Sequence, residues 1–227
     1  MEEILEAVEL ETAPSPTTSV LWMHGLGADG YDFPPIVETL DLPPVGIRFV
    51  FPHAPMRPVT INGGYVMRAW YDILGQEFGG HEDEAGLRAS EQLVRHLIAR
   101  EEERGTPAER IVLAGFSQGG AIALQTGLRH ERRLGGLLVL SAYVPILGTI
   151  AAEASEANRN VPIFMAHGTF DPTVPIHYAR RSSEILTGMG YPVEWHEYPM
   201  PHSVAPEEVG DIGAWLKQVL APKRSKQ

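Results

Sequence analysis

The sequence predicts an α/β fold, in which helices cover both faces of a mostly parallel β-sheet. Short apolar runs with the character of buried strands alternate along the chain with stretches that have helical spacing. The runs at 111–114 and 137–140 are continuously apolar, as expected of strands that are covered on both faces. No linker or shift of composition divides the 227 residues, so we expect one domain over 1–227, with 222–227 as a disordered tail.

Each expected element follows from its own local pattern. The segment 193–198 alternates in polarity and is expected at the outside of the sheet, whereas the other strands are more uniformly apolar. The helix over 82–104 repeats apolar residues at helical spacing and has acidic residues in its first turn, which favour a helix N-terminus. Strands are expected at 20–23, 47–51, 111–114, 137–140, 162–166 and 193–198, and helices near 36–37 and over 82–104, 121–129, 177–187 and 209–219.

Composition excludes several classes of function. The 18 Lys and Arg residues against 29 Asp and Glu give a net charge of −11, which repels phosphate backbones and makes nucleic acid an unexpected partner. The chain has no cysteine, which excludes disulfides, cysteine-ligated metals and a thiol nucleophile. No apolar run approaches the length of a membrane span, and the first residues are acidic where a signal peptide needs basic ones. We therefore expect a cytoplasmic protein without integral membrane contact.

A first glycine motif, Gly25-Leu26-Gly27-Ala28-Asp29-Gly30, matches the G-x-G-x-x-G pattern of dinucleotide-binding proteins and follows a predicted strand. Two features argue against that interpretation. The prolines at 34 and 35 place the start of the next helix several residues too late. No acidic residue closes the second strand, where such a protein would bind the ribose hydroxyl. A nicotinamide-dependent oxidoreductase is therefore the least favoured alternative, and no cofactor is expected.

A second motif, Gly115-Phe116-Ser117-Gln118-Gly119, lies between an apolar strand and a predicted helix. A G-x-S-x-G sequence in a strand–turn–helix context is typical of a nucleophile elbow, where a serine side chain is presented above the end of a sheet. The flanking glycines allow two segments to approach without clashes between Cβ atoms. The alternative is a glycine-rich turn without a catalytic role. Ser117 is the candidate nucleophile.

A serine hydroxyl needs a base, usually a histidine that is oriented by a carboxylate. In enzymes with such an elbow the acid and then the histidine follow the serine along the chain. Asp171 lies in a turn after the strand at 162–166, and His202 follows the strand at 193–198, so both stand where parallel sheets carry their sites. We expect Ser117, Asp171 and His202 to act together. His167 and His177, which lie on either side of Asp171, are second choices for the base, and no metal-ligand spacing is present.

Acyl transfer also needs hydrogen-bond donors for the oxyanion of the tetrahedral intermediate. One is expected from the backbone N–H of Gln118, the residue after the nucleophile. The other is expected from Leu26 in the loop after the first strong strand, which also accounts for the glycines around it.

Five segments together resemble the carboxylesterase, acyl-protein thioesterase and lysophospholipase family of α/β-hydrolases. They are 24–27, 62–73, 115–120, 167–171 and 202–204. The resemblance implies an α/β-hydrolase fold without a cap domain, hydrolysis of esters or thioesters of medium to long acyl chains, and the triad and oxyanion donors named above. A homodimer would be in keeping with the family. Two positions depart from its pattern: Pro201 stands where glycine usually precedes the histidine, and Ala142 stands where glycine often follows serine.

The sequence therefore predicts a serine carboxylesterase that works through a covalent acyl-enzyme, with a small acyl ester or thioester as its partner. Lysophospholipase or acyl-protein thioesterase activity is the alternative physiological role, and a non-catalytic binding module of the same fold is an alternative of a different class. The irregular span from 52 to 80 is long enough to be functional, and its apolar residues are expected to line the acyl chain. These residues are Ile61, Tyr65, Met67, Trp70, Ile73, Leu74 and Phe78, with core packing as the alternative for Trp70.

Overall fold

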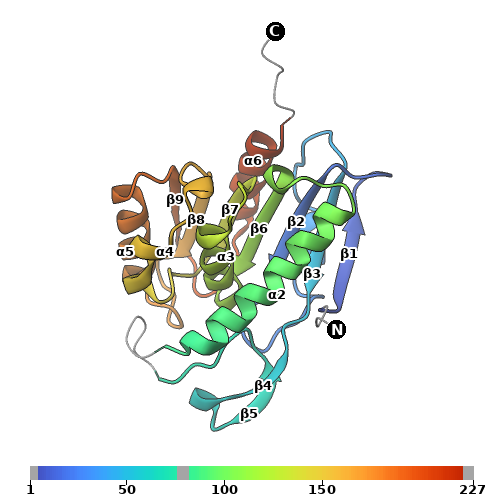
Figure 1. The fold of residues 1–227 in the computed structure, drawn as a ribbon. Coiled ribbons are helices and arrows are strands. Elements are labelled where there is room, and N and C mark those ends of the chain that lie inside the picture. The colour runs from blue at the N-terminus through green and yellow to red at the C-terminus, as the bar shows by residue number, and fades with distance from the viewer. Residues whose placement is uncertain (1–4, 76–81, 222–227) are drawn as a thin grey trace.

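The computed structural model describes residues 5–75 and 82–221, and a seven-stranded sheet forms its centre (Figure 1). The strand order is β1-β3-β2-β6-β7-β8-β9, in which β1 pairs antiparallel with β3 and all other neighbours pair in parallel. The strands are β1 Ala7–Glu11, β2 Thr18–Met23, β3 Ile47–Pro52, β6 Ile111–Phe116, β7 Gly136–Leu140, β8 Ile163–Gly168 and β9 Val193–Tyr198.

Helices cover the sheet on both faces, which confirms the predicted fold class. The helices α2, α3 and α5 pack in one hydrophobic core, and α1 and α6 pack in the other. Alternation along β2 shows why both faces need cover, because Leu21 and Met23 enter the first core while Val20 and Trp22 enter the second. The helices are α1 Pro34–Val37, α2 Glu84–Glu103, α3 Gln118–Arg129, α4 Ile150–Glu153, α5 Ile176–Gly188 and α6 Pro206–Leu220.

The structure contains strands that the sequence did not predict at two places, and the short helix α4 was also not expected. The strand β1 was not expected; it is half-exposed and acidic, so its apolar pattern is weak. The span from 52 to 80, expected to be irregular, contains an antiparallel hairpin of β4 (Met56–Val59) and β5 (Tyr65–Arg68). This hairpin lies apart from the main sheet (Figure 1) and exposes much of its surface, which explains why no buried-strand pattern marks it.

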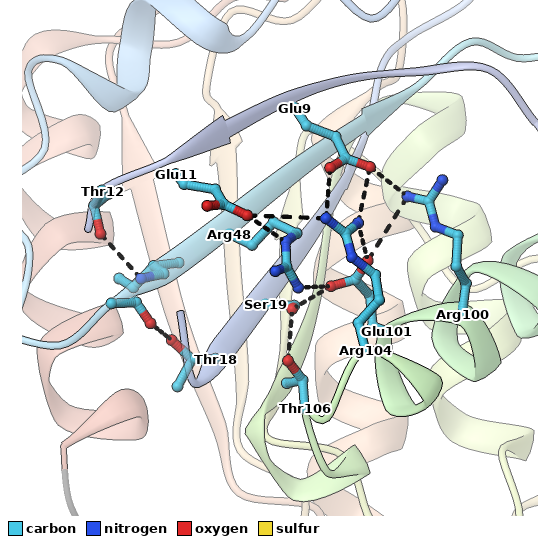
Figure 2. A network of polar contacts seen from close by, with 12 residues as sticks. Glu9, Glu11, Thr12, Thr18, Ser19, Arg48, Arg100, Glu101, Arg104 and Thr106 are labelled. Carbon is cyan, nitrogen blue, oxygen red and sulfur yellow. Dashed lines mark hydrogen bonds and ion pairs between the residues drawn. The ribbon is translucent and has the colours of Figure 1, made fainter. Parts of the chain in front are cut away.

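A network of charged side chains ties the C-terminal end of α2 to the first strands (Figure 2). The carboxylate of Glu101 is fully buried and accepts hydrogen bonds from Arg48 Nη1 at 2.9 Å, Ser19 Oγ at 2.7 Å and Arg104 Nη1 at 3.0 Å. Arg104 also reaches Glu9 on β1 at 2.9 Å. Because each buried charge in the network has a partner, the network connects α2 to β1 and β3 without leaving an isolated buried ion.

No helix in the part of the chain that the structure describes is both long and apolar enough to cross a lipid bilayer. The predicted disordered tail at 222–227 lies outside the described residues.

Candidate active site

Ser117 occupies a strained turn between β6 and α3. Its backbone has φ +55° and ψ −120°, a conformation that non-glycine residues rarely adopt and that occurs mainly at functional sites. The turn is held from both sides, since the N–H of Ser117 donates to Leu140 O at 2.9 Å and its carbonyl accepts from Ala121 N at 3.0 Å. The strand–turn–helix that the motif predicts is therefore present, and α3 begins at Gln118 rather than near 121.

The glycines around Ser117 are required by close contacts between backbone segments. A Cβ atom on Gly119 would lie 2.2 Å from the carbonyl oxygen of Met23 on β2, and one on Gly115 would lie 2.2 Å from the carbonyl carbon of Gly119. Backbone atoms cannot give way as a flexible side chain can. The sharp turn thus depends on residues that have no side chain.

Asp171 lies in the turn after β8, and its two carboxylate oxygens have different partners. Oδ1 accepts the backbone N–H groups of Thr173 at 2.8 Å and Val174 at 2.9 Å. Oδ2 contacts Nδ1 of His202 at 2.6 Å. Because a carboxylate accepts, Nδ1 of His202 is the donor, which leaves Nε2 of that ring available for a proton from elsewhere.

His167 lies behind Asp171 rather than in the position of a base. Its fully buried ring places Nε2 3.3 Å from Asp171 Oδ2 and 2.8 Å from Val174 O. Burial alone would raise the pKa of Asp171, but the hydrogen bonds from His167, His202 and Val174 outweigh it and hold this pKa below its usual value. Asp171 is therefore ionised at neutral pH.

His202 lies in the loop between β9 and α6, and its ring packs against Phe116, the residue before Ser117, with 4.6 Å between ring centroids. The loop crosses directly over the end of β8, since a Cβ atom on Gly168 would lie 2.3 Å from Met200 O and 2.5 Å from Pro201 O. Pro201, the departure noted in the sequence, is exposed and leaves the contact between Asp171 and His202 in place.

A cavity of about 70 Å³ lies beside Ser117, and both expected oxyanion donors, Leu26 and Gln118, line it. As the first residue of α3, Gln118 has a backbone N–H that no intrahelical carbonyl accepts. Its side chain is also used, since Oε1 accepts from Trp70 N at 3.1 Å and Nε2 donates to Tyr71 O at 2.9 Å. Gln118 therefore joins the elbow to the segment that follows β5, a role that the sequence did not reveal.

His24 shapes the loop that carries Leu26. The N–H of Ala54 donates to its Nε2 at 3.0 Å, so Nδ1 carries the proton and donates to Gly25 O at 2.7 Å. Burial lowers the pKa of His24, which is thus held neutral. With both ring nitrogens engaged, it positions the loop and is not available as a base.

Five of the residues that were expected to line the acyl chain lie in three different environments: the cavity, the core and the exposed surface. Ile73 lines the cavity. Trp70 does not; its indole is fully buried in the core and donates from Nε1 to His24 O at 2.9 Å, so the expectation of an acyl contact was wrong and the core-packing alternative holds. Ile61, Tyr65 and Leu74 are exposed on or near the hairpin, outside the cavity.

Two members of that set remain. Met67 lies beside the loop that carries Leu26, with its sulfur 3.6 Å from the position of a Cβ atom on Gly27. Phe78 lies outside the described residues. Sequence reasoning missed five residues that line the cavity: Tyr71, Ala142, Tyr143, Thr173 and Val174. Each follows the end of a strand or neighbours a predicted site residue, and this position is the signal that could have found it.

Within residues 5–75 and 82–221, no three histidine or acidic side chains gather as a metal site would require. The chemistry that the described groups offer is that of a serine, an imidazole and an ionised carboxylate.

Residues 6–220 match the family model described as phospholipase/carboxylesterase. The chain belongs to the phospholipase/carboxylesterase family. Its curated relatives include the acyl-protein thioesterase 1 of Gibberella zeae, which is 39% identical over 91% of this chain and 92% of that protein. The acyl-protein thioesterase 1 of Mycosarcoma maydis is also 39% identical, over 90% of this chain and 92% of that protein.

Solved structures agree with this membership. SOBER1 of Arabidopsis thaliana matches with a TM-score of 0.83 and 35% identity, covering 89% of this chain and 99% of that one. The acyl-protein thioesterase 2 of Zea mays matches with a TM-score of 0.83 and 28% identity, covering 95% and 100%. As a member of the phospholipase/carboxylesterase family, the protein is a serine hydrolase with esterase or thioesterase activity, and its fold is the α/β-hydrolase fold.

Proposed function

We propose that Ser117, His202 and Asp171 form the catalytic triad of this enzyme, and that it hydrolyses acyl thioesters and esters in two covalent steps. The observation that carries the proposal is the 2.6 Å hydrogen bond between Asp171 and His202, whose ring packs on Phe116, the residue before a serine in a strained elbow. The hydrogen bond fixes the tautomer of His202 so that Nε2 can accept a proton.

In the first step, Oγ of Ser117 forms a bond to the acyl carbonyl carbon while its proton passes to Nε2 of His202. The carbonyl oxygen becomes an oxyanion, and the N–H groups of Leu26 and Gln118, both of which line the cavity, are its expected donors. The bond from carbon to the leaving oxygen or sulfur then breaks, and the leaving group takes the proton from His202. Water repeats the sequence and releases the acid, and Asp171 stabilises the imidazolium in both steps.

The acyl chain is expected to enter the cavity beside Ser117, whose lining is mainly apolar. At about 70 Å³ it holds little more than two groups of the size of a water molecule, each of which takes about 30 Å³. Tyr143 lines this cavity and also a groove of about 860 Å³ between the start of α2 and α5, so we place it as the wall between them. A short acyl group therefore fits as the cavity stands, and a longer one requires Tyr143 to move.

The substrate class is drawn from the relatives. Those named acyl-protein thioesterase 1 are 39% identical over nearly the whole chain, which supports S-acylated proteins as the physiological substrate. The cytoplasmic location and the homodimer expected from the sequence belong to this proposal, and cell fractionation and analytical ultracentrifugation test them.

The decisive experiment compares the wild type with Ser117→Ala on p-nitrophenyl butyrate and on S-butyryl and S-palmitoyl thioesters. Loss of all turnover by the variant, with an unchanged circular dichroism spectrum, supports the proposal. A fluorophosphonate probe should label the wild type at Ser117 and leave the variant unlabelled. Turnover or labelling that persists in Ser117→Ala would show that another residue is the nucleophile.

A further inference from the structure

A groove begins beside His202, and Ser117 does not line it. It consists of two hollows of about 230 and 400 Å³ that share Ile36 and Val204 and so form one continuous depression. Phe116 and His202 close its inner end, and Pro206 and Val209 on α6 line its outer end. We call it the α1–α6 groove after the helices on its two sides.

The acyl cavity and the α1–α6 groove are lined by different members of the proposed triad. Ser117 lines the cavity, whereas His202 lines the groove, and neither residue lines both. In acyl transfer the acyl carbon becomes bonded to the serine, while the leaving oxygen or sulfur receives its proton from the histidine. A substrate placed for both events therefore extends from the serine side past the histidine, toward the groove.

We propose that the α1–α6 groove binds the leaving group of the substrate, and that Asp32 at its inner end favours leaving groups that carry a positive charge. This inference rests on the proposed triad, because it assigns proton delivery to His202. The apolar walls, among them Phe33, Ile36 and Val204, suit an alkyl or side-chain body. The ligand class is accordingly a cationic alcohol or thiol, such as a thiol carried on a basic peptide.

The charge argument comes from the residues that line the groove. Among the described residues that line it, Asp32 and His202 are the ones that ionise, and none is a lysine or an arginine. Asp32 is exposed, and the partial burial of its carboxylate together with the nearby carboxylate of Asp29 raises its pKa. A cation bound beside two carboxylates relieves their mutual repulsion, and the net charge of −11 attracts it from a distance.

The step balances without any further reagent. The carbon–sulfur bond of the tetrahedral intermediate breaks, its electron pair leaves on sulfur, and the proton on Nε2 of His202 passes to that sulfur. The released thiol lies in the groove and departs, and water then enters beside His202 for deacylation.

The test uses two thioesters with the same acyl group and leaving groups of the same shape. S-butyrylthiocholine has a cationic leaving group, and S-(3,3-dimethylbutyl) thiobutyrate is its uncharged carbon isostere. Thiol release is followed with Ellman's reagent, and the protein itself gives no background because it has no cysteine. The variants are Asp32→Asn and, as a matched control, Glu38→Gln, which removes an exposed carboxylate beside α1 that does not line the groove.

We expect Asp32→Asn to lower kcat/KM for the cationic substrate about three- to fivefold, the range of a partly exposed ion pair, and to leave the neutral isostere unchanged. A high concentration of sodium chloride should also reduce the preference of the wild type for the cationic substrate over its neutral isostere. An equal effect of Asp32→Asn on both substrates, or none on either, would overturn the assignment of charge selection. A wild type that cleaves neither substrate would instead contradict the proposed function itself, and the groove with it.

A second variant tests whether the groove holds the body of the leaving group. Gly210 lines the outer end, and a Cβ atom there would meet open space, so Gly210→Leu fills the groove without a backbone clash. We expect it to lower kcat/KM for S-hexyl thiobutyrate at least threefold and to leave S-methyl thiobutyrate unchanged. Gly188→Leu, on α5 with equally open surroundings, is the control. If both thioesters respond alike to Gly210→Leu, the leaving group does not lie in the groove.

Discussion

Oδ2 of Asp171 lies 2.6 Å from Nδ1 of His202, and this contact fixes the imidazole that the proposed mechanism uses. In Asp171→Asn the amide can still accept from the backbone at 173 and 174, so the turn should survive, but the negative charge that stabilises the imidazolium is lost. We expect kcat on p-nitrophenyl butyrate to fall by about 10³ to 10⁴. Asp41→Asn, at an exposed carboxylate that pairs with Lys217 of α6, should leave kcat unchanged. A decrease of less than tenfold in Asp171→Asn would contradict the triad.

Tyr143 is expected to limit the length of the acyl group. Its hydroxyl donates to Glu82 at 3.1 Å, and it lines both the acyl cavity and the large groove beside α5. Tyr143→Ala should open that wall and raise the ratio of kcat/KM for p-nitrophenyl octanoate over the butyrate by about tenfold, since each buried methylene adds to transition-state binding. Tyr143→Phe keeps the ring and should keep the ratio. If Tyr143→Ala and Tyr143→Phe both keep the wild-type ratio, another residue limits the length of the acyl group.

Gly119 is expected to tolerate no side chain. Gly119→Ala would place a methyl group 2.2 Å from Met23 O, so β2 and α3 must separate. We expect a loss of about 1–3 kcal/mol in the free energy of unfolding and a loss of activity from displacement of the oxyanion donors. Gly210→Ala is the matched control, because its Cβ atom meets open space inside a helix, where alanine should stabilise by up to about 1 kcal/mol. Urea denaturation of the two variants measures the contrast, and equal stabilities would contradict it.

Glu208 should make the fold less stable as the pH rises. It is fully buried in the first turn of α6, and burial raises its pKa to about 7 even though Ala205 N donates to Oε2. The folded state therefore holds a proton that the unfolded state releases near pH 4.5, so the contribution to stability is complete below pH 4.5 and is lost as the pH rises through 7.

Glu208→Gln keeps the acceptor and removes the titration. We expect it to match the wild type at pH 4.5 and to exceed it at pH 8 by about 1–3 kcal/mol, from roughly 1.4 kcal/mol for each unit of pKa shift. Chemical denaturation at both pH values measures this difference, with the exposed neighbour in Glu207→Gln as the control. A variant that is less stable than the wild type at pH 8 would show that the carboxylate is not destabilised by burial.

Much of the fold follows from the sequence because its central strands are buried on both faces. A continuously apolar run such as 111–114 is typical of a strand that is covered on both faces, and the elbow motif that follows marks the end of this strand. The strand β1 and the hairpin from Met56 to Arg68 were missed because both are partly exposed and lack a buried-strand pattern. The strand β1 in addition pairs with β3, which is distant in sequence.

Part of the candidate site was predictable because its residues follow the ends of strands that the sequence reveals. Asp171 and His202 each follow a strand end, so topology brings them together, and the structure shows their contact. The buried carbonyl and amide contacts of Trp70 and Gln118 could not be foreseen, because an aromatic residue in a loop has the same local pattern whether it lines a ligand or packs in the core. The roles of the triad and of the oxyanion donors remain predictions for the experiments above.

The ion network around Glu101 involves residues near the amino ends of β2 and β3, whereas Ser117, Asp171 and His202 follow the carboxyl ends of their strands. Six residues of strand span about 20 Å, so the two regions have few neighbours in common. Substitutions in the loops around the reacting groups should thus combine freely with those near Glu101. Divergence of substrate preference, in nature or by directed evolution, can proceed at one end of this molecule while the other preserves its thermal resistance.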